Sequence, residues 1–282
     1  MESIMSSTSY LSRSLLALGL ALFFFAEASA GTIAYYRFEG DLSNSAGTGG
    51  GSVIGHELYS PSTPSPIVPQ TGLPNNQSLG LGLTSVEFNY PFPFNAPGDA
   101  TLEFWLNPAQ LGGGLYQGIL WTTTVCCDNN RFNIFLKDNM GGAGWSFNVD
   151  YREPDGTLHS LLNSEQPDGV TIPYAVPAEE WTFIALVRSG DTYSVYFNND
   201  QTPVASAIDV NPNLPTDAGW LINGWIQQSG LIDELRLSDS ALTPSEFLIS
   251  SVPEPETYVM MLAGLGLLGF AVCRRKQNQA GA

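Results

Sequence analysis

Apolar and polar residues alternate along much of the chain between residues 31 and 250, and clusters of Gly, Pro, Asn, Asp and Ser separate the alternating runs. A repeat of two predicts half-buried β-strands, whereas the helical repeat is nearly absent. Many short strands with turns between them predict an all-β, two-sheet antiparallel sandwich. The predicted strands cover 33–38, 101–107, 118–123, 131–136, 145–151, 181–188, 193–198 and 230–237.

Three segments between the strands have a different composition. Residues 41–74 are rich in Gly, Ser and Pro, which predicts a long irregular excursion with at most one short strand. Residues 189–192 predict a hairpin loop. One helical turn is predicted after the last strand, with Thr243 as N-cap, Pro244 at the first helical position and Glu246 at the third.

Both ends of the chain carry uncharged apolar runs. Residues 1–30 contain one base, Arg13, before the apolar stretch 15–26 and end in Ala28-Ser29-Ala30. This order predicts a cleaved secretory signal peptide.

At the other end, Val252-Pro253-Glu254-Pro255 precedes an uncharged run over 258–273, and the bases Arg274, Arg275 and Lys276 follow. The prolines exclude a helix at the motif. The apolar run predicts a membrane helix of about 16 residues, shorter than the roughly 20 of a comfortable span. The bases predict its cytoplasmic end. An ordinary single-pass tail anchor is the alternative to a cleaved sorting signal.

The body, residues 31–250, has the size of one sandwich domain. The chain has 27 acidic and 10 basic residues and a net charge of −17. The terminal segments hold four of each, so the body keeps 23 acids and six bases. A body this acidic repels phosphate backbones, which excludes nucleic acid as a partner.

The cysteines leave several states open. Cys126 and Cys127 are adjacent, and Cys273 lies at the end of the predicted membrane helix. A vicinal disulfide, two separate thiols, or pairing with another chain are the alternatives for the neighbours. Without a spaced cysteine framework, the domain must be held together by burial.

These residues carry two family resemblances. The tail 251–276 resembles the PEP-CTERM sorting signal, by which some Gram-negative bacteria hand exported proteins to an exosortase. The resemblance implies an inner-membrane-anchored precursor and then a place in the cell envelope or extracellular matrix. Four motifs of the body resemble the laminin-G-like, concanavalin A-like jelly roll: AYYRFEGDL (34–42), TLEFWLNP (101–108), WTFIALVRSGDTYSVYFNND (181–200) and LIDELRLSDSALTPSEF (231–247).

The resemblance to laminin-G-like domains also implies a Ca²⁺ ion near the rim of the sandwich, where oxygen ligands gather. Glu39, Asp41 and Asn44 follow the first strand, and Asp233 lies on the last one. Many members carry Asp where this chain has Asn44, so one negative ligand is missing. The alternative is that Asp41 and Asn44 cap a turn while Asp233 bonds to a loop.

The sequence lacks a catalytic pattern. Retaining glycosidases need two carboxyl groups about 5–5.5 Å apart, and no E-x-D-x-x-E strand occurs. Glu103 is the one acid on its strand, and the adjacent Asp233 and Glu234 are expected to point to opposite faces. His56 and His159 lie in loop-like stretches. We therefore predict that the protein is not an enzyme.

Tryptophan offers a way to bind sugar rings. Trp145 follows a glycine-rich segment and Trp225 lies among Asn, Gly and Gln, so these two have the most loop-like neighbours. The sequence therefore predicts an exported, non-catalytic binding or adhesion module that binds polysaccharide through Trp145 and Trp225. The alternatives are a structural or protein-binding matrix component and a glycan-degrading enzyme.

Overall fold

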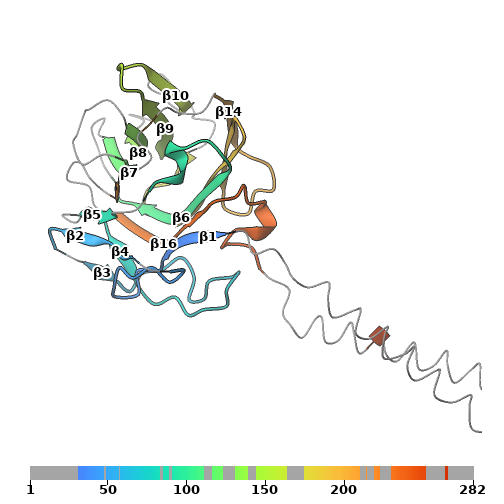
Figure 1. Cartoon of the computed structure of the whole chain (residues 1–282). Helices are drawn as coiled ribbons and strands as arrows, with labels where there is room; N and C mark the ends of the chain where they lie inside the picture. The colour runs from blue at the N-terminus through green and yellow to red at the C-terminus, as the bar shows by residue number, and fades with distance from the viewer. Residues whose placement is uncertain are drawn as a thin grey trace, which may run out of the picture.

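Two antiparallel β-sheets lie face to face in the computed structural model, which confirms the predicted jelly-roll sandwich (Figure 1). The structure describes most of the body and three residues of the tail. The described ranges are 31–47, 49–56, 58–82, 85–88, 91–110, 116–122, 131–138, 144–163, 175–209, 214, 219–222, 230–251 and 264–265.

The first sheet, called sheet I below, has the strand order β14-β13-β12-β6-β16-β4-β3, and β1 also pairs with β16. Its longest strands, β6, β12 and β16, lie side by side in the middle. The strands are β1 (Thr32–Tyr36), β3 (Tyr59–Ser60), β4 (Ser78–Gly80), β6 (Ala100–Pro108), β12 (Thr182–Ser189), β13 (Thr192–Phe197), β14 (Ala205–Ile208) and β16 (Gly230–Ser238).

The second sheet, sheet II, has the order β10-β9-β8-β7-β15-β5-β2, and β11 also pairs with β9. Its strands are β2 (Ser52–Ile54), β5 (Ser85–Phe88), β7 (Tyr116–Trp121), β8 (Arg131–Asp138), β9 (Trp145–Arg152), β10 (Leu158–Asn163), β11 (Ala175–Val176) and β15 (Trp220–Ile222). Two 3-10 turns complete the described elements, η1 (Pro93–Asn95) and η2 (Pro244–Glu246).

The main core fills the space between the sheets. Alternate residues of β6 and β12 from sheet I meet alternate residues of β8 and β9 from sheet II. Aromatic rings fill one part of this core: the Phe88 and Trp220 rings stack with centroids 4.0 Å apart, and Tyr36 packs 4.4 Å from Phe88. This burial gives the fold its stability without the help of a spaced disulfide framework.

A second apolar cluster covers the other side of sheet I. Chain from 61–77 and from 241–250 lies over that face and contributes Val68, Leu242, Phe247 and Leu248. The central strands of sheet I are therefore buried on both faces, as their nearly continuous apolar sequence requires. The sheet residues of this cluster are Tyr35, Trp105, Phe183, Ala185 and Val187.

The long strands were predicted well and the short ones poorly. All eight predicted strands correspond to observed strands, and Thr243 and Glu246 form the predicted capping box at η2. Residues 41–74 contain two short strands, β2 and β3, rather than at most one. Their two or three residues are too few to show an alternating pattern.

The expectation that Asp233 and Glu234 point to opposite faces is wrong. The pairing of β16 with β6 shifts register between Asp233 and Arg236, and Glu234 has φ +50°. This β-bulge places both acids on the outer side of sheet I, while Ile232 and Leu235 on either side enter the main core.

Several predictions fall outside the described residues. These are the signal peptide, the sorting motif, Trp225 and the pair Cys126 and Cys127. Of the predicted membrane helix, Gly264 and Leu265 are described, and their backbone is helical. Within the described ranges, no helix is long and apolar enough to cross a membrane.

Candidate functional site

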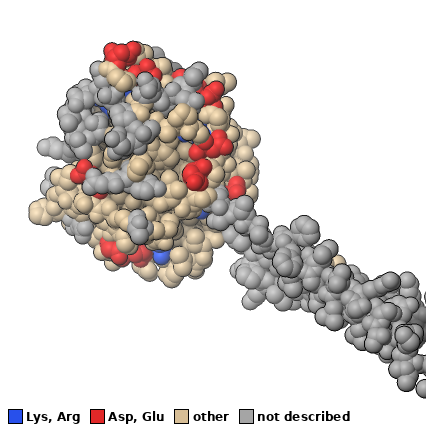
Figure 2. Space-filling view, in the orientation of Figure 1, with Lys and Arg blue, Asp and Glu red and all other residues tan. Residues whose placement is uncertain are grey.

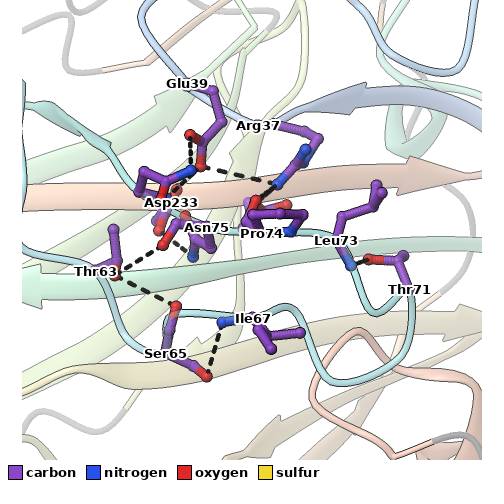
Figure 3. Close-up of polar contacts among 12 residues, drawn as sticks. Arg37, Glu39, Thr63, Ser65, Ile67, Thr71, Leu73, Pro74, Asn75 and Asp233 are labelled. Carbon is purple, nitrogen blue, oxygen red and sulfur yellow. Dashed lines mark hydrogen bonds and ion pairs between the residues drawn. The ribbon is translucent and has the colours of Figure 1, made fainter.

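Three buried carboxylates lie on the covered outer face of sheet I. Asp233, Glu234 and Glu103 are each 0% exposed. Asp233 accepts a hydrogen bond from Asn75 Nδ2 at 2.9 Å, and its second oxygen has no partner in the described part of the chain (Figure 3). Burial, and to a smaller extent the neighbouring Glu234, raises the pKa of Asp233 to about 8.

The other two carboxylates are paired with arginines. Glu234 accepts hydrogen bonds from the Tyr35 hydroxyl and from Arg37, whose Nη2 lies 3.1 Å from Glu234 Oε1. Glu103 accepts a hydrogen bond from Arg236, which also donates to Gln70 Oε1 at 2.8 Å. Buried carboxylates with such partners hold loops in place and are closed to a substrate.

Two of the four predicted metal ligands, Asp41 and Asn44, are engaged in turns. Asp41 Oδ1 accepts hydrogen bonds from the Ser43 backbone and hydroxyl, so it caps a turn. The side-chain oxygen of Asn44 accepts from the backbone N–H groups of Tyr35 and Ala46. No group of three or more His, Cys, Asp or Glu residues suited to a metal occurs in the part of the chain that the structure describes.

Glu39 and Asp233 are brought to the same region by the loop 61–77. The Glu39 carboxylate accepts hydrogen bonds from the Asn76 backbone at 2.7 Å and from its side chain at 3.2 Å (Figure 3). The neighbouring Asn75 binds Asp233 and keeps a buried Oδ1 without a partner among the described residues. The sequence analysis did not select Asn75 as a candidate metal ligand, because it lies 158 residues from Asp233 in the chain.

Trp145 belongs to the core. Its side chain is 2% exposed and its indole N–H donates to the Ala109 carbonyl oxygen at 3.2 Å. The prediction that Trp145 stacks on a sugar at the surface is therefore wrong. The glycine-rich segment before it suggested a loop, but Trp145 is the first residue of β9 and points inward.

His159 is also part of a structural contact. Its Nδ1 lies 3.1 Å from Asp209 Oδ2, and its ring stacks on Tyr151 with centroids 4.3 Å apart. His159 comes from β10 of sheet II and Asp209 follows β14 of sheet I, so the contact joins the edges of the two sheets.

The outer face of sheet II carries a different set of side chains. Because β8 and β9 alternate in regular antiparallel register, every second residue faces away from the core. We call these side chains, with the adjoining residues of β7, the β7–β9 face. They are Tyr116, Gly118, Trp121, Arg131, Asn133, Phe135, Lys137, Ser146, Asn148, Asp150 and Arg152.

Aromatic and polar side chains form neighbouring rows on this face. Trp121 lies opposite Asn133, which in turn lies opposite Asp150. In the next row Phe135 lies opposite Asn148. The Trp121 indole covers Gly118, since a Cβ there would lie 2.4 Å from the ring. Trp121 and Phe135 remain partly exposed.

Two amides on the β7–β9 face are only half satisfied. Asn133 donates to Asp150 Oδ1 at 2.6 Å, and Asn148 donates to the Ser146 carbonyl oxygen at 3.1 Å. The amide oxygens of both asparagines are buried and accept no hydrogen bond from any described residue. A buried acceptor without a partner is costly.

Comparison with known proteins gives two family matches. A family model described as the concanavalin A-like lectin/glucanases superfamily matches residues 82–247. A model of the PEP-CTERM protein-sorting motif matches residues 251–276. A search of curated proteins found no match.

Solved structures with a similar fold include sugar-bound domains. One is domain 4 of AbnA, a GH43 extracellular arabinanase from Geobacillus stearothermophilus, in complex with arabinotriose; identity is 20%, the match covers 78% of this chain and 98% of that one, and the TM-score is 0.54. Another is the ligand-binding domain of botulinum neurotoxin serotype D in complex with N-acetylneuraminic acid, with 10% identity, 78% and 50% coverage and a TM-score of 0.54.

A third similar structure is the binding domain of Paraclostridial Mosquitocidal Protein 1, with 12% identity, 78% and 51% coverage and a TM-score of 0.55. The match therefore spans about half the length of the two toxin structures. At these identities the likeness establishes the fold alone.

Proposed function

Because the chain belongs to the concanavalin A-like lectin/glucanases superfamily, we propose that its body is a non-catalytic module that binds glycans through the β7–β9 face. The PEP-CTERM motif marks the chain as an exported protein that is processed at the envelope. The observation that carries the proposal is the pair of partly exposed rings, Trp121 and Phe135, beside the outward polar side chains of β8 and β9.

The arrangement suits a sugar ring. Trp121 and Phe135 offer apolar surfaces for the C–H groups of the ring, and the polar side chains of Asn133 and Asn148 lie directly opposite them in the paired strands. Sites that combine apolar surface with a few fixed polar atoms give both affinity and orientation.

The carboxylates support binding without catalysis. Asp150 is the one acid at the outward positions of the described strands β7, β8 and β9. The closely spaced acids of sheet I lie under the chain 61–77 and 241–250, where a polysaccharide has no access. A retaining mechanism needs two carboxyl groups on opposite sides of one glycosidic bond.

We expect Phe135→Ala to weaken polysaccharide binding about tenfold, which corresponds to ~1.4 kcal/mol. Isothermal titration of the body, after a glycan array has selected the ligand, measures the effect. Ile208→Ala is the matched control, because Ile208 is 81% exposed on β14 of the other sheet. Unchanged affinity in both Phe135→Ala and Trp121→Ala would contradict the proposed face.

A protein-binding matrix component is the second candidate. Ile208 on β14 and Leu158 on β10 are 81% and 50% exposed, and these two edge strands contact each other. Exposed apolar side chains at sheet edges favour contacts with another chain. Failure of every glycan to bind, together with self-association or capture of a matrix protein that Ile208→Lys abolishes, would favour this function.

Calcium remains a proposal at Asp233. The unpartnered oxygens of Asp233 and Asn75 fit a hard cation, whereas Asp41 and Asn44 are engaged in turns. Asp233, Asn75 and Glu39 would hold the ion, which would supply a positive charge that ties the loop 61–77 to sheet I. A carboxylate ligand must lose its proton to bind the ion.

We therefore expect Ca²⁺ to raise the melting temperature, and more so as pH rises. Below about pH 8 Asp233 holds its proton in the metal-free protein, so the shift should be small at pH 6 and larger at pH 9. At 100 times Kd the ion adds ~2.7 kcal/mol of stability. Differential scanning calorimetry measures the shift; Asp233→Asn should abolish it and Asp41→Asn should preserve it. An equal shift in Asp233→Asn would exclude this site.

A further inference from the structure

The basic residues of the body are distributed unevenly. The body has six, and three of them lie on or next to strands of sheet I. Arg37 binds Glu234, Arg236 binds Glu103, and Arg188 is 1% exposed and binds backbone carbonyl groups. Acidic side chains are scattered over the surface in Figure 2, whereas basic ones show at few points.

The three remaining bases all lie on the β7–β9 face. Arg131 and Lys137 are at the two ends of the outward row of β8, and Arg152 ends the outward row of β9. Lys137 Nζ lies 5.3 Å from the centre of the Tyr116 ring. A chain with a charge of −17 has thus gathered its remaining cations around the rings and amides described above.

Two of these cations face each other. Arg131 and Arg152 are directly opposite in the pairing of β8 with β9, where like charges destabilise a sheet. The Asp150 carboxylate lies near both guanidinium groups, but it already accepts a hydrogen bond from Asn133. Arg131 Nε is buried and donates to no described residue. Within the described ranges, Asp150 is the one carboxylate at an outward position of these strands.

We propose that the glycan bound by the β7–β9 face is anionic, with carboxylate or sulfate groups that pair with Arg131, Arg152 and Lys137. The inference rests on the proposed glycan-binding function and specifies its ligand. Guanidinium groups bind such anions through two parallel hydrogen bonds. The many acids elsewhere on the body do not forbid this, because at physiological salt charges farther than ~8 Å are largely screened.

The test compares polymers that differ in charge alone. Alginate and carboxyl-reduced alginate form one pair, and dextran sulfate and dextran form the other, at 0.15 M salt. We expect the protein to bind at least one anionic polymer tenfold or more tightly than its neutral counterpart. The Arg131→Gln/Arg152→Gln double variant should remove this preference, and Arg131→Lys/Arg152→Lys should keep most of it, which separates charge from folding.

The possible results distinguish failure of the anionic-ligand inference from failure of the proposed glycan-binding function. Equal affinity for both members of each pair, with sensitivity to Phe135→Ala, would overturn the anionic ligand and leave glycan binding in place. A charge preference that survives in the Gln double variant would place the anion elsewhere and overturn the assignment to these residues. If no polymer or glycan binds, the proposed function fails, and the inference fails with it.

Discussion

Arg188→Met should lower the free energy of unfolding by about 3–5 kcal/mol, the largest loss that we expect from a single substitution in the body. Arg188 ends the predicted strand 181–188 and is 1% exposed. Its guanidinium group donates to the carbonyl oxygens of Pro93 and Phe94 at 3.1 Å and also to those of Ala96 and Gly98. The substitution removes this donor from all four carbonyl oxygens, of which that of Phe94 is in a buried bond and that of Pro93 keeps the Ala96 N–H at 3.4 Å.

The measurement is urea unfolding of the body, followed by circular dichroism. The melting temperature should fall by roughly 6–20 °C at ~2–4 °C per kcal/mol for a domain of this size. Arg152→Met is the matched control, because Arg152 is partly exposed and makes one backbone bond, to Gly156 at 2.8 Å. A loss for Arg188→Met no greater than for this control would show that the carbonyl contacts contribute little.

The strands could be predicted because they depend on local pattern. In β6, Leu102, Phe104 and Leu106 line the main core while Trp105 enters the cluster on the other side, as the alternation requires. The bulge at Asp233 and Glu234 could not be read in this way. Nothing in the letters Ile-Asp-Glu-Leu distinguishes a regular strand from one with an extra residue.

The sequence analysis placed the proposed sugar contacts on other residues than those of the β7–β9 face. The sequence analysis sought tryptophans with loop-like neighbours, and this criterion selected Trp145, which is a core residue. Arg131, Asn133 and Phe135 lay inside the predicted strand 131–136. Their role in a binding face depends on the pairing of β8 with β7 and β9. Alternation shows which residues share a face, but only the sheet order shows which rows become neighbours.

The same limit applies to the metal proposal. Glu39 and Asp233 lie near opposite ends of the body, and the pairing of β1 with β16 brings these ends together. Asn75 directly follows the predicted irregular segment 41–74, and its contact with Asp233 depends on how 61–77 folds over sheet I. Hydrogen bonds across such separations are a property of packing and leave no local pattern.

Replacement of Pro253-Glu254-Pro255 by three alanines should block C-terminal processing almost completely while export continues. Intact mass of the wild-type protein from its native host should show neither residues 1–30 nor residues 258–282. The variant should instead keep its C-terminus and stay in the inner-membrane fraction. The physical reason lies in the sequence: the two prolines exclude a helix, so the segment can bind a protease as an extended strand.

The position of the motif supports this result. Ser251, the first residue of the tail, is exposed, and the apolar run 258–273 begins a few residues later. An anchor of about 16 apolar residues ended by Arg274, Arg275 and Lys276 would hold the motif at the outer surface of the membrane. Alanines at Gln277-Asn278-Gln279 make the matched control, because they lie beyond the bases and should not alter processing. A wild-type protein recovered from the inner membrane with its C-terminus intact would instead identify a permanent tail anchor, and the glycan-binding face would then act at the membrane rather than in the matrix.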